Sequence, residues 1–196
     1  FMDGIVMGGG MGISQGAALR VVTERTKMAM PETAIGLFPD VGGGYFLSRC
    51  PGHVGEWLAL TGDTIGAGDA IAFGLADGCL PLDAQAPVWD ALGTQTFADG
   101  AAVKAFVASK LIAADATMAG VKGQIDQYFS LDSASAITAA LEAADSEWAR
   151  STAATLRKRS PLMLHVVLEQ IRRARGMGLA DDLRMERDMV RHCFFL

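Results

Sequence analysis

The stretch AMPETAIGLFPDVGG, residues 29–43, places two acids, Glu32 and Asp40, in one short segment. Each acid follows a proline, and the residues between them are otherwise apolar, glycine or threonine. Proline fixes its own φ and biases the preceding residue toward extended backbone, so we expect a stiff, largely non-helical loop. Burial raises a carboxyl pKa, and two neighbouring acids split their titrations. Such a pair can supply a base or nucleophile and a separate proton carrier, although composition alone favours two solvent-exposed acids.

A glycine run lies upstream of this segment. Residues 8–12, GGGMG, join an expected strand over residues 1–7 to an expected helix over residues 11–22. Such a turn allows close backbone approach and leaves free N–H groups at a positive helix end, which suits a phosphate or an oxyanion formed in acyl chemistry. The run fits neither GxGxxG nor a Walker loop. A tight structural turn is the open alternative.

Residues 12–16, GISQG, formally match the GxSxG elbow of α/β-hydrolases. An elbow needs its serine at the sharp turn that directly follows a strand, whereas Ser14 falls within the expected helix. Acids and histidines occur downstream, but nothing in the sequence marks a triad. The sequence therefore does not favour a serine nucleophile.

Composition limits the class of protein. The chain has 196 residues, 51% of them hydrophobic, which fits one sizeable domain or a core with an appended helical region. A net charge of −5 argues against a nucleic-acid partner. The three cysteines lack the spacing of a metal site or a disulfide framework. No apolar run approaches the roughly 20 residues that span a bilayer, so we expect no membrane association.

The chain changes character near residue 82. Residues 1–82 alternate strands, helices and glycine turns, which is an α/β pattern, with further strands expected at 27–30 and 77–80 and helices at 53–61 and 66–73. Residues 83–196 predict an all-helical region, with helices at 89–97, 101–113, 117–129, 133–143, 146–159, 162–175 and from 179 to the end. We therefore predict an α/β portion at 1–82 that carries the acidic loop, followed by a helical region at 83–196.

Taken together, residues 2–12 (MDGIVMGGGMG) and 29–43 resemble the crotonase (enoyl-CoA hydratase/isomerase) superfamily, and within it the 3-hydroxyisobutyryl-CoA hydrolases. The resemblance is close over residues 1–80 and persists at Ser160-Pro161 and at residues 186–188. It implies the crotonase (ClpP-like) ββα spiral fold with its N-terminal part missing, followed by the helical region.

The resemblance also implies roles for the two acids. Hydratases carry a glutamate just after the glycine turn, where this chain has Gly12. Glu32 is implied to attack as a nucleophile that forms an acyl-enzyme anhydride, or to activate water directly. Asp40 is implied to orient Glu32 or the water and to carry a proton, and Gly9 to donate one of two oxyanion-hole N–H groups. The same match implies substrate contacts from Gly8, Gly10, Pro31 and Phe38.

The expected activity is hydrolysis of a short hydroxyacyl-CoA thioester, with 3-hydroxyisobutyryl-CoA of valine degradation as the substrate. CoA is then part of the substrate, and neither a further cofactor nor a metal is expected. Two alternatives stay open: an enoyl-CoA isomerase or hydratase-like enzyme with Glu32 as sole base, and a non-catalytic fragment that binds acyl-CoA or partner subunits. A homo-oligomer is compatible with the family, and Ala/Gly/Arg-rich usage points to a bacterial cytoplasmic protein.

Both ends of the chain look cut, because it begins without Met inside a strand and stops directly after a helical pattern. Members of the family have earlier strands, which bring the other oxyanion donor and much of the CoA pocket, and they continue past the last residue here. We therefore expect little hydrolysis by these 196 residues alone if they are a fragment.

Overall fold

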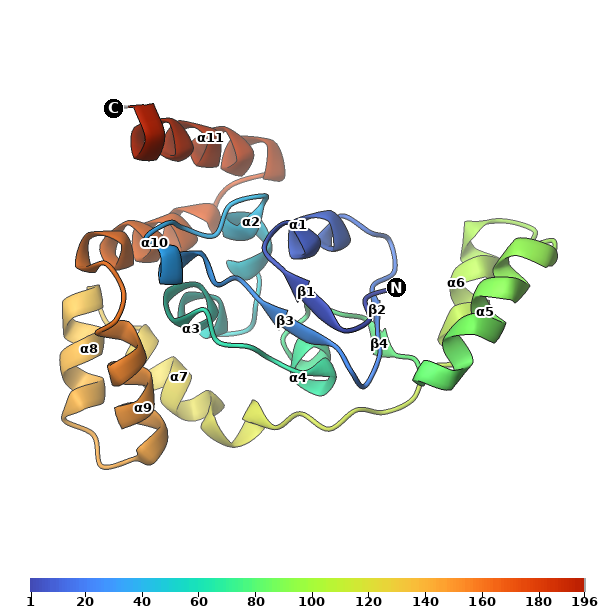
Figure 1. Ribbon diagram of the computed structural model, residues 1–196, viewed down its shortest axis with the longest axis horizontal. Helices are drawn as coiled ribbons and strands as arrows, with labels where there is room; N and C mark the ends of the chain where they lie inside the picture. Colours follow the sequence, from blue (N-terminus) through green and yellow to red (C-terminus); the bar gives the residue numbers. More distant parts are fainter. Residues whose placement is uncertain (196) are drawn as a thin grey trace.

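The computed structural model describes residues 1–195, and its strands lie at the centre of the molecule (Figure 1). The first part of the chain contains β1 (Ile5–Met7), α1 (Gly9–Gln15), β2 (Val21–Val22), β3 (Lys27–Ala29), the 3-10 turn η1 (Glu32–Ile35), α2 (Gly43–Leu47), α3 (Val54–Thr61), α4 (Ala67–Ala72) and β4 (Gly78–Cys79). The second part contains α5 (Leu82–Thr94), α6 (Gly100–Ala108), the 3-10 turn η2 (Met118–Val121), α7 (Lys122–Phe129), α8 (Ala134–Glu142), α9 (Glu147–Leu156), α10 (Pro161–Ala174) and α11 (Leu179–Phe195). The division after residue 82 stays a prediction.

The strands form two short parallel pairs. β1 pairs with β3, with Val6 opposite Met28, and β2 pairs with β4, with Val22 opposite Cys79. An isolated parallel bridge between Met2 and Val22 links the two pairs. The side chains of these four paired residues are buried, as expected for parallel strands that are covered on both faces, whereas the β1–β3 pair begins with Ile5 opposite Lys27, which are both exposed.

The predicted helix over residues 11–22 is wrong at both ends. Helix α1 begins within the glycine run and ends at Gln15, and residues 21–22 form β2. The Arg20 N–H donates to Asp77 Oδ2 at 2.7 Å, and the Asp77 N–H donates to the Arg20 carbonyl at 2.7 Å. These bonds draw the following residues alongside β4, where two buried β-branched side chains suit a strand.

Most of the later helices are confirmed, with ends that differ by one to three residues. Ser133, Ser146 and Ser160 each accept a backbone N–H in the first turn of α8, α9 and α10, as good N-caps do. Other boundaries were wrong: α5 spans Leu82–Thr94 instead of 89–97, α6 ends at Ala108, and α7 begins at Lys122 after a 3-10 turn. Residues 109–117 leave the helix because the Ile112 N–H donates to the Cys79 carbonyl at 2.8 Å, at the edge of β4.

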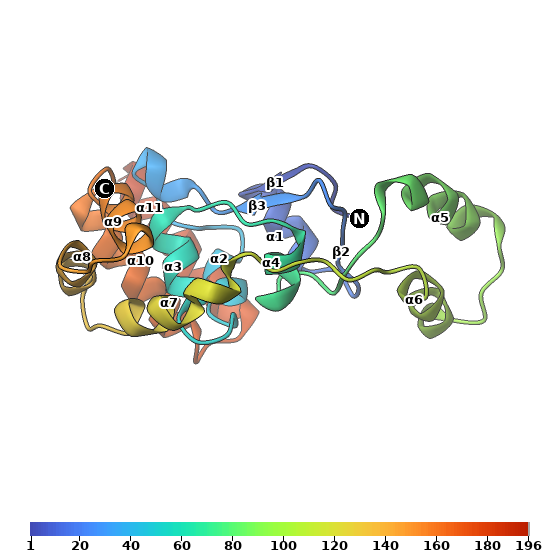
Figure 2. The ribbon, with the colours of Figure 1, turned by 90° about the horizontal axis from the view of Figure 1, so that it is seen from below.

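Helix α3 is the centre of the main core, because every residue from Val54 to Thr61 is buried. Helices α7, α9 and α10 pack around it on one side of the strands, and α11 lies across α2 (Figure 1). The hairpin of α5 and α6 projects from the end of the molecule that lies opposite the α7–α10 helices, in both views (Figure 1 and Figure 2). A small second core of Val21, Leu80, Val88 and Val107 joins this hairpin to β2 and β4. In residues 1–195, no helix combines the length and apolar character needed to cross a bilayer.

Candidate active site

Glu32 opens the turn η1, directly after Pro31, so the predicted non-helical loop contains one 3-10 turn. The Leu37 N–H donates to the Glu32 carbonyl at 3.0 Å, and Thr33 Oγ1 donates to the Leu60 carbonyl of α3 at 3.2 Å. These bonds fix the turn against the buried helix. A Cβ atom built on Gly8 would lie 2.9 Å from Glu32 Oε1, so the carboxyl group lies against the glycine run.

The glycine run presents the start of α1 beside this carboxyl group. Gly8 has φ +50° and ψ −118°, a conformation that favours glycine, and its N–H donates to the Ala29 carbonyl of β3 at 3.2 Å. No side chain caps α1, and Gly9 and Gly10 are exposed. The first N–H groups of a helix have no partner within it and can therefore bind an anion. The predicted donor Gly9 thus follows Gly8, the residue at which any Cβ atom would meet the Glu32 carboxyl group.

The environment of Glu32 changes its acidity. Burial, with a smaller contribution from the negative charge of Asp40, raises the pKa of Glu32 to about 7 against the lowering effect of the backbone N–H of Glu32. Its Oε2 atom is buried without a hydrogen-bond partner among residues 1–195. A carboxyl group that titrates near neutral pH is well matched to proton transfer or nucleophilic attack.

Asp40 lies in the loop between η1 and α2. It is half-buried, and its carbonyl accepts the Gly43 N–H at 2.8 Å. The next two residues have left-handed backbone, with φ +54° at Val41 and +87° at Gly42. This conformation is unusual for valine and costs free energy that the surrounding structure must offset. The negative charge of Asp40 in this loop contributes to the raised pKa of Glu32.

The same loop occupies the space next to Gly12. A Cβ atom at position 12 would lie 2.6 Å from the Val41 carbonyl oxygen and 2.7 Å from Val41 Cβ. Real Cβ atoms essentially never approach so closely, and the obstacle includes backbone. A glutamate side chain at position 12, where hydratases carry one, therefore does not fit this loop.

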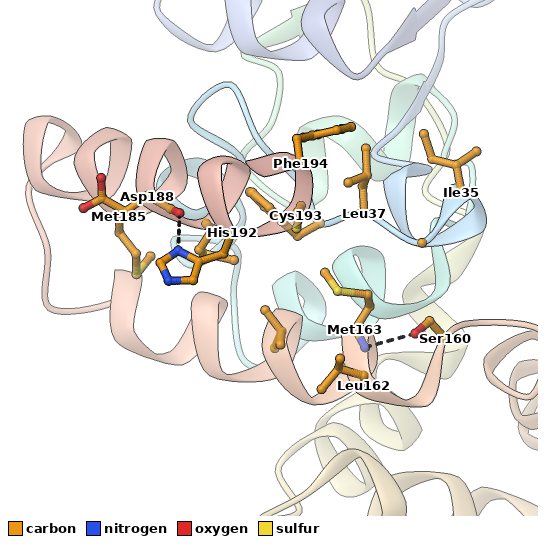
Figure 3. Close-up of a pocket in the computed structure, with 14 residues that line it drawn as sticks. Ile35, Leu37, Ser160, Leu162, Met163, Met185, Asp188, His192, Cys193 and Phe194 are labelled. Atoms are coloured by element: carbon orange, nitrogen blue, oxygen red, sulfur yellow. Dashed lines mark hydrogen bonds between the residues drawn. The ribbon is translucent and has the colours of Figure 1, made fainter. Parts of the chain in front are cut away.

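The other predicted substrate contacts are not gathered in one place. Gly8 lies at the Glu32 carboxyl group, Gly10 is exposed, and Pro31 lies near Gly62 of the α3 end. Phe38 is 2% exposed and lines a different feature, a mostly apolar cavity of about 1060 Å³ between residues 35–38, α10 and α11. Figure 3 shows this cavity, whose lining includes neither of the two predicted catalytic acids. The structure thus brings Glu32 and the glycine run together, with Asp40 linked to Glu32 by its charge, and leaves Phe38 outside.

Three buried polar residues near the acidic loop were not identified as site residues from the sequence. They are Gln170 of α10 and Asp182 and Glu186 of α11. The signal was present in the spacing, because positions 182, 186 and 189 share one helix face, and Met189 of that face packs against the core. Two acids on an inward face are unusual unless they have partners. In residues 1–195, no three His, Cys, Asp or Glu side chains are grouped so that they could hold a metal ion.

Comparisons with known proteins identify the family of the chain. The profile of the enoyl-CoA hydratase/isomerase family matches residues 1–195. The chain is 37% identical to a probable 3-hydroxyisobutyryl-CoA hydrolase 2 of Arabidopsis thaliana, over 97% of this chain and 52% of the relative. It is 40% identical to the small ribosomal subunit protein mS47 of the same plant, over 94% of this chain and 47% of the relative.

Solved structures give the same result for the fold. A carnitinyl-CoA dehydratase from Mycobacterium thermoresistibile superposes with a TM-score of 0.86 at 43% identity, over 94% of this chain and 53% of the other. This likeness confirms the predicted crotonase fold.

The comparisons also correct one expectation. The predicted bacterial cytoplasmic location is wrong, because the curated relatives are plant, fungal and vertebrate proteins that include 3-hydroxyisobutyryl-CoA hydrolases named as mitochondrial. Amino-acid usage carries little information on location, and that expectation rested on it alone. The chain spans about half the length of the curated relatives it matches. By its matching profile, its relatives and its fold, the chain belongs to the enoyl-CoA hydratase/isomerase family.

Proposed function

We propose that this chain carries the catalytic carboxyl groups of a hydrolase that cleaves short hydroxyacyl-CoA thioesters, with 3-hydroxyisobutyryl-CoA as the substrate. The observation that carries the proposal is the position of Glu32, whose carboxyl group lies against the glycine run and has a pKa of about 7. The identity of 37% to a probable 3-hydroxyisobutyryl-CoA hydrolase supports the choice of substrate.

The proposed reaction can follow two routes, and both use the Glu32 carboxyl group, the thioester carbonyl and one water molecule. In one, a Glu32 oxygen forms a bond to the thioester carbon, the C–S bond breaks, CoA leaves as the thiolate and takes a proton, and water then cleaves the anhydride. In the other, Glu32 takes a proton from the water that attacks the carbonyl. In both, Asp40 is proposed to orient the attacking group or carry the proton, and the Gly9 N–H to stabilise the oxyanion. Loss of one such donor costs about 3–4 kcal/mol of transition-state stabilisation.

The close approach of Val41 to Gly12 argues against addition of water to an enoyl-CoA by two glutamates. An isomerase with Glu32 as sole base is the alternative enzyme. A non-catalytic role is the alternative of another class, and the 40% identity to a ribosomal protein favours it specifically. In both enzymatic alternatives we propose that the ligand is an acyl-CoA. For the hydrolase, we propose valine degradation as the pathway. We also propose that the protein self-associates through its helical region.

The test measures thiol release from 3-hydroxyisobutyryl-CoA and, in parallel, hydration of crotonyl-CoA. The protein is expressed together with any sequence that flanks these 196 residues in its gene. We expect thiol release, with a loss of about 10²–10⁴-fold in Glu32→Gln and a smaller loss in Asp40→Asn. Glu147→Gln, a change at an exposed glutamate of α9, is the matched control and should retain the rate. CoA binding with neither reaction would refute the enzyme and favour the non-catalytic role.

A further inference from the structure

Helix α11 reaches the loop that carries Asp40 through two buried acids. Glu186 accepts the Gly42 N–H at 2.8 Å through Oε2 and the Gly44 N–H at 3.0 Å through Oε1. Asp182 Oδ2 accepts the Tyr45 N–H at 3.0 Å. These three N–H groups belong to the residues where α2 begins, at the positive end of the helix. The two carboxyl groups therefore bind the backbone that directly follows Asp40 and Val41, at three N–H groups.

The other side of the loop is held by α10. Gln170 Nε2 donates to the Pro39 carbonyl at 2.7 Å, and Gln170 is itself 2% exposed. Asp40 and Val41 are thus the two residues between these attachments. No side chain hydrogen bond within residues 1–195 holds the Asp40 carboxyl group itself, so its position depends on how the backbone on both sides is held.

The two acids also influence each other. Asp182 and Glu186 are 0% and 3% exposed, and Asp182 Oδ1 is buried without a hydrogen-bond partner among residues 1–195. Two buried acids this close repel each other when both are ionised, so the negative charge of Asp182 raises the pKa of Glu186. Burial raises the pKa of both groups, that of Glu186 to about 8. The charged group that faces them is Arg49, which follows α2, and Gln170 on α10 is neutral.

We propose that Asp182 and Glu186 are positioning residues that together hold the backbone of the Asp40 loop in the conformation that presents Asp40 to the site of Glu32. Neither acid lines the contact between Glu32 and the glycine run, so their effect on the reaction is indirect. The inference rests on the proposed function for its effect on rate, but the effect on the loop itself can be measured without any substrate.

The structural test uses Glu186→Gln and Asp182→Ala, with Asp181→Asn as the matched control. Asp181 lies in the same first turn of α11, is exposed, and pairs with Arg184. A glutamine at position 186 keeps one acceptor for two N–H groups, so amide hydrogen exchange at Gly42 and Gly44 should accelerate about tenfold or more. The pKa of Glu32 should fall, because Asp40 is no longer held beside it. The control should leave both quantities unchanged.

The kinetic test separates positioning from folding. In variants that keep the wild-type circular dichroism spectrum, kcat should fall about tenfold or more with KM nearly unchanged. If Glu186→Gln does not fold, Asp182→Ala, which removes the acceptor of the Tyr45 N–H and leaves both Glu186 contacts, carries the test. Folded variants with unchanged amide exchange, Glu32 titration and kcat would overturn the proposal. A wild-type protein without hydrolysis would refute the proposed function alone, since the exchange and titration experiments still decide the role of the pair.

Discussion

The substitution Glu32→Gln should stabilise the protein at alkaline pH while it removes the proposed activity. Burial raises the pKa of Glu32 from its ordinary value of 4.5 to about 7, so the folded chain keeps a proton that the unfolded chain has already lost. Below pH 4.5 both states are protonated, and stability is highest. As pH rises through 7, the folded state must ionise a buried group, and stability falls. A glutamine stays neutral and avoids this loss.

The size of the effect follows from the same pKa. A change from 4.5 to about 7 corresponds to about 3.4 kcal/mol at 1.36 kcal/mol per pH unit. Because Glu32 is only half-buried, solvent screening reduces the expected value to about 2 kcal/mol. Relative to wild type, Glu32→Gln should therefore gain about 1.5 kcal/mol between pH 5 and pH 8.5, because the unfolded chain is already largely ionised at pH 5. The raised pKa of Glu186 affects both proteins and cancels in this difference.

Urea unfolding at the two pH values measures this difference directly, from the midpoint and slope of each transition. The control Glu147→Gln, at an exposed position, should change little between pH 5 and pH 8.5. A difference between wild type and Glu32→Gln that is the same at both pH values would refute the reasoning, because it would show that Glu32 titrates alike in the folded and unfolded chains.

Three further substitutions test separate parts of the structure. Asp40→Asn removes a negative charge that raises the pKa of Glu32, so the Glu32 carboxyl resonance followed by NMR should titrate at lower pH; an unchanged midpoint would place Asp40 too far away. Gly12→Glu should lower the free energy of unfolding by about 2 kcal/mol or more without adding crotonyl-CoA hydration, since no side chain fits there; a stable, hydrating variant would contradict this. Arg175→Ala should cost about 2–3 kcal/mol in urea unfolding, because it removes a two-oxygen contact to the fully buried Glu56; a loss below about 0.5 kcal/mol would show that the pair is not needed.

The sequence was sufficient for the local patterns and insufficient for long-range contacts. Serine caps and glycine stops mark helix ends within a few residues, so α8 and α10 could be located from the chain alone. The strand β2 could not, because it depends on the ion pair between Arg20 and Asp77, which lie far apart in sequence. Tertiary hydrogen bonds of this kind override a helical spacing pattern.

In the candidate site, too, the local pattern could be predicted from the sequence and the long-range contacts could not. The loop sequence with its two prolines pointed to Glu32 and Asp40, and the structure places Glu32 against the glycine run, with the charge of Asp40 raising its pKa. Helix α11 contributes Asp182 and Glu186 from the far end of the chain, and no local pattern shows which backbone N–H groups they bind. The spacing could indicate only that two acids face inward, not what they hold.

The pH dependence of thiol release from 3-hydroxyisobutyryl-CoA tests the central claim most directly, since the claim is that an ionised Glu32 performs the reaction. We predict that kcat/KM rises with pH to a plateau with a midpoint of about 7, and that Glu32→Gln has almost no activity at any pH. A Glu32→Gln protein that keeps the wild-type rate and pH profile would contradict the account.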